Sequence, residues 1–165
     1  MDRLWAPWRI QYILGPRDEG CFLCDRPAQN ADRKNLILRR ARTCFAILNA
    51  YPYNPGHLMV APYKHTGELD GLTEQELTEL MVLLRECQDV VRRAMNPAGF
   101  NIGINLGKVA GAGVLDHVHI HLVPRWDGDV NFMPVTGSVR VIPQALEETY
   151  DQLLKHLPAA GIVGA

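Results

Sequence analysis

Hydrophobic and polar positions alternate with the period of a β-strand in several short segments of the chain. The clearest is 116–126, where three histidines alternate with Val118, Ile120 and Leu122 until Pro124 ends the pattern. A strand here places the histidines on one face and the aliphatic side chains behind them, in a core. The same period, or a short apolar run, predicts further strands at 36–38, 44–48, 57–61, 100–106 and 138–142.

One long segment has the period of a helix instead. Apolar residues recur at spacings of three and four between Leu77 and Met95. Thr73 and Glu76 have the spacing of a capping box at the start, and the turn formers of 96–99 end the pattern. A shorter helix is expected from Pro143 to about His156, whereas the polar stretch from Asp25 to Lys34 is expected to be a loop.

The order of these elements predicts the fold class. Strands in hairpins, one long helix and then two more strands favour an α+β fold, with an antiparallel sheet of about five strands and the long helix on one face. The 165 residues suit a single domain, with an aromatic N-terminal arm at about 1–20 and a C-terminal extension at about 127–165. The arm is expected either to pack on its own domain or to embrace a second subunit.

Composition narrows the choice of partners. With 47% apolar and 21% charged residues the chain is typical of a soluble globular protein. Its net charge of −1 gives no general attraction to nucleic acid or membranes, so any recognition of phosphate must be local. No apolar run approaches the roughly 18 to 20 residues that span a bilayer. The first residues do not lead into a signal-peptide core, and the cytoplasm is the expected location.

Cys21 and Cys24 have the spacing of two thiolate ligands of a structural zinc ion. Such a site needs two further ligands, for which His65 and one strand histidine are available. A redox disulfide is an alternative, although the motif lacks the strand before it and the helix after it that this reading expects. Unligated cysteines are the third possibility.

Three imidazoles on one strand face allow two kinds of chemistry. They can ligate a metal ion, or one can attack a phosphorus or acyl centre while its neighbours donate hydrogen bonds to the developing charge. The bland interpretation is a solvated polar face. The glycine-rich stretch from Gly107 to Gly113 matches neither a Walker A loop nor a dinucleotide fingerprint, but its backbone amides can face a phosphate if it is more than a hairpin turn.

These residues resemble the histidine triad family. Residues 117–123, His-Val-His-Ile-His-Leu-Val, match its pattern of three histidines alternating with hydrophobic residues. Residues 54–62 resemble the strand that precedes the long helix in those proteins, and the similarity runs over about 36–125. Residues 48–57 and the ending 123–126, with Asp129 and Phe132, are most similar to bacterial diadenosine tetraphosphate phosphorylases and then to fragile histidine triad hydrolases.

The resemblance implies a two-step nucleotidyl transfer. His119 matches the middle histidine, which attacks the α-phosphate of a dinucleoside polyphosphate and gives a nucleotidyl-histidine that phosphate or water resolves. His121 matches the third histidine, which contacts the phosphate. Asn49 matches the residue that holds the ribose, and Asn105 lies where related proteins contact the phosphates with a polar side chain. His57 is expected to support the site rather than to touch the substrate.

The resemblance also implies a structural zinc ion and no organic cofactor. The first histidine, matched by His117, ligates zinc in members that carry the Cys-x-x-Cys motif, together with a histidine placed as His65 is here. Cys21, Cys24, His65 and His117 are therefore the expected ligands. A homodimer is expected from the family.

Two departures from the pattern bear on the activity. Hydrolases of the family carry a glutamine shortly before the triad, whereas this chain has Ala112 and Gly113 and one extra residue before His117. Backbone amides, with Gly113 as the expected contact, have to replace that side chain. The Cys-x-x-Cys motif is not universal among phosphorylase-like members, so the zinc and phosphorylase expectations come from different relatives.

The expected function is phosphorolysis of diadenosine tetraphosphate to ADP and ATP, with a nucleotide and inorganic phosphate as partners and neither nucleic acid nor membrane. The alternatives are hydrolysis of dinucleoside polyphosphates or of nucleoside phosphoramidates. Two other classes stay open: a non-catalytic nucleotide-binding module, and a zinc hydrolase that uses all three strand histidines as ligands.

Overall fold

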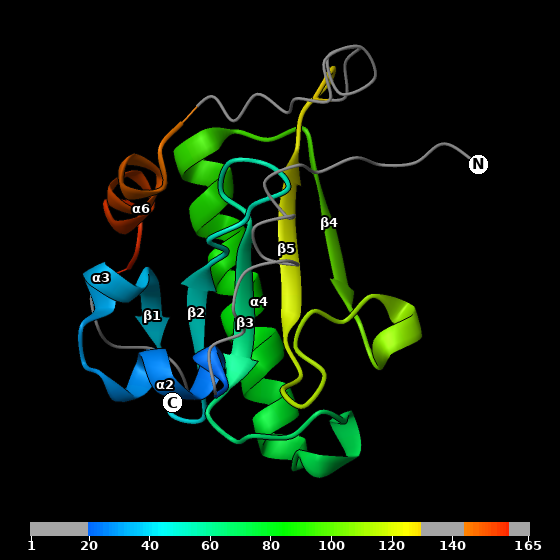
Figure 1. Ribbon diagram of the computed structural model, residues 1–165. Coiled ribbons are helices and arrows are strands. Elements are labelled where there is room, and N and C mark those ends of the chain that lie inside the picture. Colours follow the sequence, from blue (N-terminus) through cyan, green and yellow to red (C-terminus); the bar gives the residue numbers. More distant parts are fainter. Residues whose placement is uncertain (1–19, 130–143, 159–165) are drawn as a thin grey trace.

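A computed structural model describes residues 20–129 and 144–158. Five antiparallel strands form one sheet in the order β1-β2-β3-β5-β4 (Figure 1). This confirms the predicted α+β class and strand number. The strands are β1 (Ile37–Arg40), β2 (Cys44–Leu48), β3 (Leu58–Pro62), β4 (Gly99–Ile104) and β5 (Ile120–Arg125).

One long helix, α4 (Glu74–Met95), accompanies the sheet. Its predicted capping box is present: the Thr73 hydroxyl accepts from the backbone of Glu76, whose carboxylate accepts from the Thr73 backbone. Asn96 ends the helix in a left-handed conformation. The shorter elements are α2 (Phe22–Ala28), α3 (Asp32–Asn35), η1 (Leu69–Gly71), η2 (Lys108–Ala110) and α6 (Leu146–Leu154).

The sheet is buried on both faces over its central strands. Helix α4 crosses one face and packs its apolar stripe against β2, β3 and β5 (Figure 1). A smaller apolar cluster on the other face includes Leu23 of α2, Phe45 and Met59. None of the helices in the described part of the chain is both long and apolar enough to cross a bilayer.

The histidine segment differs from its prediction. Pairing of β5 begins only at Ile120, where the strand lies between Val60 of β3 and Ile104 of β4. His117 and His119 therefore precede the ladder, and both are buried rather than displayed on an open strand face. The backbone N–H of Val118 donates instead to a carbonyl beyond the end of β3, that of Thr66, at 2.7 Å.

The prediction of a polar loop at 25–34 was wrong, because α2 and α3 occupy most of it. Residues 25–34 are mostly polar, but tertiary contacts hold the two helices in place. Leu23 is fully buried, and the Asn35 side chain donates to the Arg26 carbonyl at 3.0 Å. A helix therefore does follow the first cysteine, contrary to the expectation from the sequence. The predicted strand at 138–142, Phe132, and all but the last residue of the aromatic arm at about 1–20 lie outside the described residues.

Glu79 joins α4 to the turn between β1 and β2. This buried carboxylate accepts hydrogen bonds from the backbone N–H groups of Arg42 and Thr43, at 3.2 and 2.7 Å, and from the Thr43 hydroxyl. Burial alone raises the pKa of Glu79, but these donors outweigh it and hold the pKa below its ordinary value. The ionised carboxylate therefore stabilises the hairpin against the helix.

We expect Glu79→Gln to lower the free energy of unfolding by about 1–3 kcal/mol at pH 7, because the amide replaces an ionised acceptor of several hydrogen bonds. A carboxylate with a depressed pKa stabilises the fold above its unfolded-state pKa, and this contribution is lost as the pH falls through its folded-state pKa. The difference between wild type and variant should therefore shrink below pH 4.5, the ordinary pKa of a glutamate. Urea denaturation across this range measures it.

Gln75→Ala, at an exposed position one helical turn before Glu79, serves as the control and should change stability by less than about 0.5 kcal/mol at either pH. An undiminished difference for Glu79→Gln in acid would contradict the role assigned to the ionised carboxylate.

Candidate functional site

The first histidine of the triad lies in a cluster with the two cysteines. The Nδ1 of His117 is 3.2 Å from the Sγ of Cys21 and 3.4 Å from that of Cys24, and the latter sulfur is 3.3 Å from the Nδ1 of His65. These four side chains are the residues that the sequence predicts as zinc ligands. Their ligand atoms all lie within 4.8 Å of one another.

The cluster fits a tetrahedral metal ion. Zinc bonds of about 2.3 Å to sulfur and about 2.0 Å to nitrogen place a sulfur and a nitrogen ligand roughly 3.5 Å apart around a tetrahedron. The three sulfur–nitrogen separations given above are close to this value. The Nε2 of His117 donates to the Pro62 carbonyl at 2.8 Å, so the Nδ1 lone pair faces the sulfurs. Burial and the neighbouring Cys21 raise the pKa of Cys24 to about 11, and a bound cation supplies the charge that two adjacent thiolates need.

The middle histidine is fixed by its own backbone neighbourhood. His119 is only 5% exposed, and its Nδ1 lies 2.9 Å from the carbonyl oxygen of His117. A carbonyl can only accept, so Nδ1 carries the proton and the lone pair is on Nε2. Burial lowers the pKa of His119 below its ordinary value and outweighs this hydrogen bond, which acts in the opposite direction. The neutral form of the ring is therefore favoured, and its Nε2 has the free lone pair that a nucleophile needs.

The third histidine receives its orientation from His57. The Nδ1 of His57 accepts from the backbone N–H of Tyr53 at 3.1 Å, so its proton is on Nε2, which lies 3.0 Å from the Nδ1 of His121. His57 donates there, and the proton of His121 is consequently on Nε2. The rings of His119 and His121 meet edge to face, with centroids 4.8 Å apart. The ring that has a lone pair on Nε2 is therefore next to a ring that carries an N–H donor.

This arrangement separates the two kinds of chemistry that the sequence left open. Among the described residues, the group that could hold a metal ion includes His117 but neither His119 nor His121. The geometry therefore does not support a hydrolytic site in which all three histidines ligate one metal. It is suited to a nucleophile next to a hydrogen-bond donor.

The structure brings Asn49 to this group. Asn49 follows β2, its Nδ2 is 3.5 Å from the Nε2 of His57, and its Oδ1 accepts from the backbone N–H of Tyr51 at 2.9 Å. Asn105 and Gly113 belong to a different segment, the connection from β4 to β5. Asn105 is half-buried directly after β4, and Gly113 is exposed before the triad.

Three positions that support the site were not singled out by the sequence. The carbonyl oxygens of Pro62 and Thr66 accept from the His117 ring and the Val118 backbone. At Gly67 an added Cβ would lie 2.6 Å from the carbonyl oxygen of Leu115, so the two segments touch without a side chain between them. Every residue has a backbone carbonyl, so the roles of Pro62 and Thr66 cannot be predicted from the sequence. Only Gly67 is a residue type that could have indicated a close approach of two segments.

A buried amide anchors the loop on the other side of the histidines. The Nδ2 of Asn54 donates to the Pro124 carbonyl at 2.9 Å and to the carboxylate of Asp129 at 2.8 Å. Arg125 pairs with the same carboxylate and, together with the backbone N–H of Trp126 and the Asn54 amide, holds the pKa of Asp129 far below its usual range. This network fixes the loop that leads into His57.

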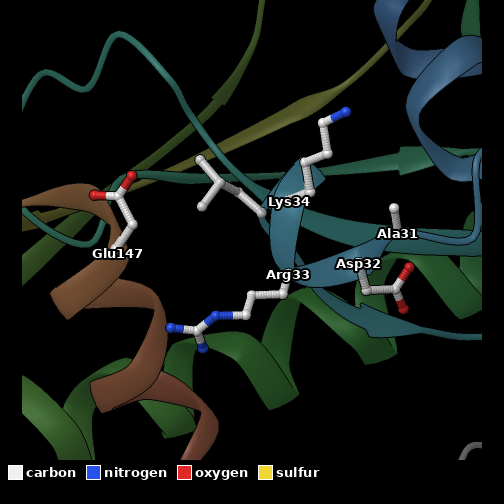
Figure 2. A pocket seen from close by; sticks show the side chains of 6 residues that line it. Ala31, Asp32, Arg33, Lys34 and Glu147 are labelled. Carbon is white, nitrogen blue, oxygen red and sulfur yellow. The ribbon is translucent and has the colours of Figure 1, made fainter.

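The hollow in Figure 2 lies elsewhere, between α3 and α6. It is open to solvent, and neither histidine nor cysteine lines it. Arg33 extends across it toward α6 and pairs with Asp151 of that helix. The hollow is therefore separate from the candidate site. Its lining residues are Ala31, Asp32, Arg33, Lys34, Leu36 and Glu147.

Comparison with known proteins gives a consistent result. The family model described as HIT domain matches residues 30–128. The AP-4-A phosphorylase of Mycobacterium tuberculosis is 41% identical over 157 residues, which cover 90% of this chain and 80% of that protein. The bis(5'-nucleosyl)-tetraphosphatase [asymmetrical] of Schizosaccharomyces pombe is 37% identical over 93 residues, covering 56% of this chain and 50% of that protein.

Solved structures agree on the fold. A zinc-bound histidine triad family protein from Mycobacterium smegmatis superposes with a TM-score of 0.67 at 26% identity, covering 83% of this chain and 92% of that one. A hypothetical histidine triad nucleotide-binding protein from Sulfolobus tokodaii has a TM-score of 0.64 at 26% identity, covering 82% and 88%.

Proposed function

Because the chain belongs to the HIT domain family, we propose that it cleaves dinucleoside polyphosphates through His119, and that its reaction is the phosphorolysis of diadenosine tetraphosphate to ADP and ATP. The observation that carries this proposal is the buried, neutral ring of His119, whose Nδ1–H is held by the His117 carbonyl so that Nε2 has the lone pair. The similarity to an AP-4-A phosphorylase over most of both chains supports the choice of substrate.

The first step uses the lone pair of His119. Its Nε2 attacks the α-phosphorus, a nitrogen–phosphorus bond forms, and the bond from that phosphorus to the bridging oxygen breaks so that ATP leaves. His121, whose Nε2 carries a proton, donates a hydrogen bond to a phosphate oxygen as charge develops there. Asn49 binds the ribose. The backbone at Gly113 and the side chain of Asn105 contact the phosphates.

The second step uses inorganic phosphate. An oxygen of phosphate attacks the phosphorus of the nucleotidyl-histidine, His119 leaves with its lone pair restored, and AMP becomes ADP. Hydrolysis is the second candidate, because water can attack in the same position and release AMP. The similarity to an asymmetrical bis(5'-nucleosyl)-tetraphosphatase favours this alternative.

We expect His119→Ala to keep the fold but to lower turnover of diadenosine tetraphosphate at least about a thousandfold, because the covalent route is lost. Wild-type protein with phosphate should give ADP and ATP, and a stop in mid-reaction should leave AMP attached to His119. Chromatography of the products and mass spectrometry of the protein measure both.

His156→Ala, in the turn after α6, is the control and should turn over at the wild-type rate. Products of AMP and ATP at every phosphate concentration would replace phosphorolysis by hydrolysis. Near-wild-type turnover in His119→Ala would refute the nucleophile itself.

We also propose that Cys21, Cys24, His65 and His117 hold a zinc ion. The three short sulfur–nitrogen separations in this cluster and the zinc-bound relative from M. smegmatis support this. A bound zinc would compensate the charge of the two thiolates and cross-link α2 to the segments around His65 and His117. It has a structural role, since His119 and His121 carry the reaction.

Protein purified from zinc-supplemented cells should contain one zinc ion per chain by mass spectrometry of the elements, and Cys24→Ser should lose most of it, since two nitrogen contacts converge on that sulfur. Removal of the metal should lower the melting temperature of the wild type. Metal-free protein with a disulfide between Cys21 and Cys24 would favour the redox interpretation instead.

A homodimer is part of the proposal. Strand β4 is at an edge of the sheet and carries exposed aliphatic side chains on one face, at Ile102 and Ile104, with Leu106 just beyond its end. A second copy of the chain is the occupant that we propose for this surface.

Light scattering should give the mass of a dimer for the wild type and the mass of a monomer for the double variant Ile102→Lys, Ile104→Lys. The two lysine charges would be buried in the interface without opposite charges, which is strongly unfavourable. The exposed Met81→Lys change on α4 is the control and should leave the mass unchanged. A monomeric wild type would contradict the proposal.

A further inference from the structure

We propose that His117 is a positioning residue that links the metal-binding cluster to the nucleophile. Its ring belongs to the cluster, whereas its backbone carbonyl holds the Nδ1–H of His119. A cation held by the cluster thereby sets the direction of the lone pair that attacks phosphorus. This inference rests on the proposed function, because it takes His119 as the nucleophile, but it adds a role in the reaction to residues that never touch the substrate.

The peptide group between His117 and Val118 is the mechanical link. Its C=O accepts from the ring of His119 at 2.9 Å, and its N–H donates to the Thr66 carbonyl at 2.7 Å. A peptide unit is planar with these two groups pointing in opposite directions, so fixing one fixes the other. The orientation of the nucleophile therefore depends on where Thr66 lies relative to His117.

The cluster controls that relation because it holds both segments. His65, next to Thr66, and His117, next to Val118, both approach the Sγ of Cys24, at 3.3 and 3.4 Å. The two segments also touch directly at Gly67, where a Cβ would lie 2.6 Å from the Leu115 carbonyl oxygen. A small displacement of one segment is thus transmitted to the other.

The ladder of the sheet does not hold this peptide. Pairing of β5 with β3 and β4 begins at Ile120, one residue after the nucleophile. Cysteine sulfur is a weak partner in hydrogen bonds, so without a cation the cluster contributes little restraint. Coordinate bonds from four ligands replace those weak contacts by a rigid cross-link.

Loss of that cross-link should affect the tautomer of His119. Only a ring whose Nδ1–H meets a fixed carbonyl has its lone pair on Nε2 in every molecule. A loosened carbonyl allows the other tautomer and other ring rotations, and misplacement of a reacting group by about 1 Å can slow a reaction as much as a hundredfold. Binding of the substrate depends on other residues and should be little changed.

The test compares the zinc-loaded protein with the same protein after chelation, and with Cys24→Ser. Nitrogen-15 spectra of the imidazoles report the tautomer of each histidine without any substrate. In the loaded protein His119 should show one protonated and one unprotonated nitrogen, and after chelation the two signals should move toward an average. The kcat for diadenosine tetraphosphate should fall at least about tenfold while KM changes less than about twofold.

Two further samples separate positioning from general structural damage. Cys24→His restores a fourth ligand and should recover metal binding, the His119 signals and kcat together. His156→Ala marks a histidine outside the cluster and should leave the His119 signals in place in the loaded protein. Circular dichroism checks that each sample is folded.

If chelation unfolds the chain, cadmium replaces zinc. The larger ion lengthens the ligand bonds in a protein that stays loaded and folded, so the His119 nitrogen signals should differ between the two forms. Unchanged His119 signals and an unchanged kcat in the folded metal-free protein would overturn the proposal, as would identical signals in the zinc and cadmium forms. The spectra are recorded without substrate. The positioning role can therefore be confirmed even if the proposed reaction is refuted, and it can be refuted even if the reaction is confirmed.

Discussion

The hydrogen bond from the ring of His119 to the carbonyl of His117 is the constraint on which the site depends. It disfavours one of the two neutral tautomers of a buried imidazole, and burial lowers the pKa of His119 and so disfavours the charged form. The same principle operates at each neighbouring ring. His117 is fixed by the Pro62 carbonyl, and His121 by His57, whose own Nδ1 accepts from a backbone N–H. Backbone groups therefore fix the tautomers of His117, His119 and His57, and His57 in turn fixes that of His121.

The triad histidines 117 and 121 have different surroundings, and their proposed roles differ for that reason. Toward α2 the partners are sulfur atoms, which suit a soft cation. Next to β3, the partner of His121 is the imidazole of His57. This ring fixes the nitrogen on which His121 carries its proton and does not bind an ion. In the proposed mechanism, alternating residues of one segment therefore belong to a metal site and to a reaction centre, and the two are joined by a single peptide group. The separation of the two explains why a metal can be close to the nucleophile without being part of the chemistry.

Much of this could be predicted from the sequence. The period of the apolar residues gave the α+β class, the antiparallel sheet and the long helix with its capping box, because those signals are local. The Cys-x-x-Cys spacing and the alternating histidines gave the members of the cluster, which the structure brings together. The pattern of apolar residues did not predict that the pairing of β5 begins only at Ile120, nor did it predict the helices at 22–35. These depend on tertiary contacts such as those of Thr66 with Val118 and of Leu23 with the core.

The cluster joins residues that are far apart along the chain. Cys21 meets His117 across 96 positions, and His65 meets Cys24 across 41. Contacts of such long range form late in folding, since much loop entropy must be lost before they are made. A nascent or partly folded chain with its sheet half assembled therefore has three imidazoles but no oriented lone pair. Under the proposed mechanism, reactivity toward phosphorus would arise only once these distant segments have met, so an incompletely folded chain would not carry out the reaction.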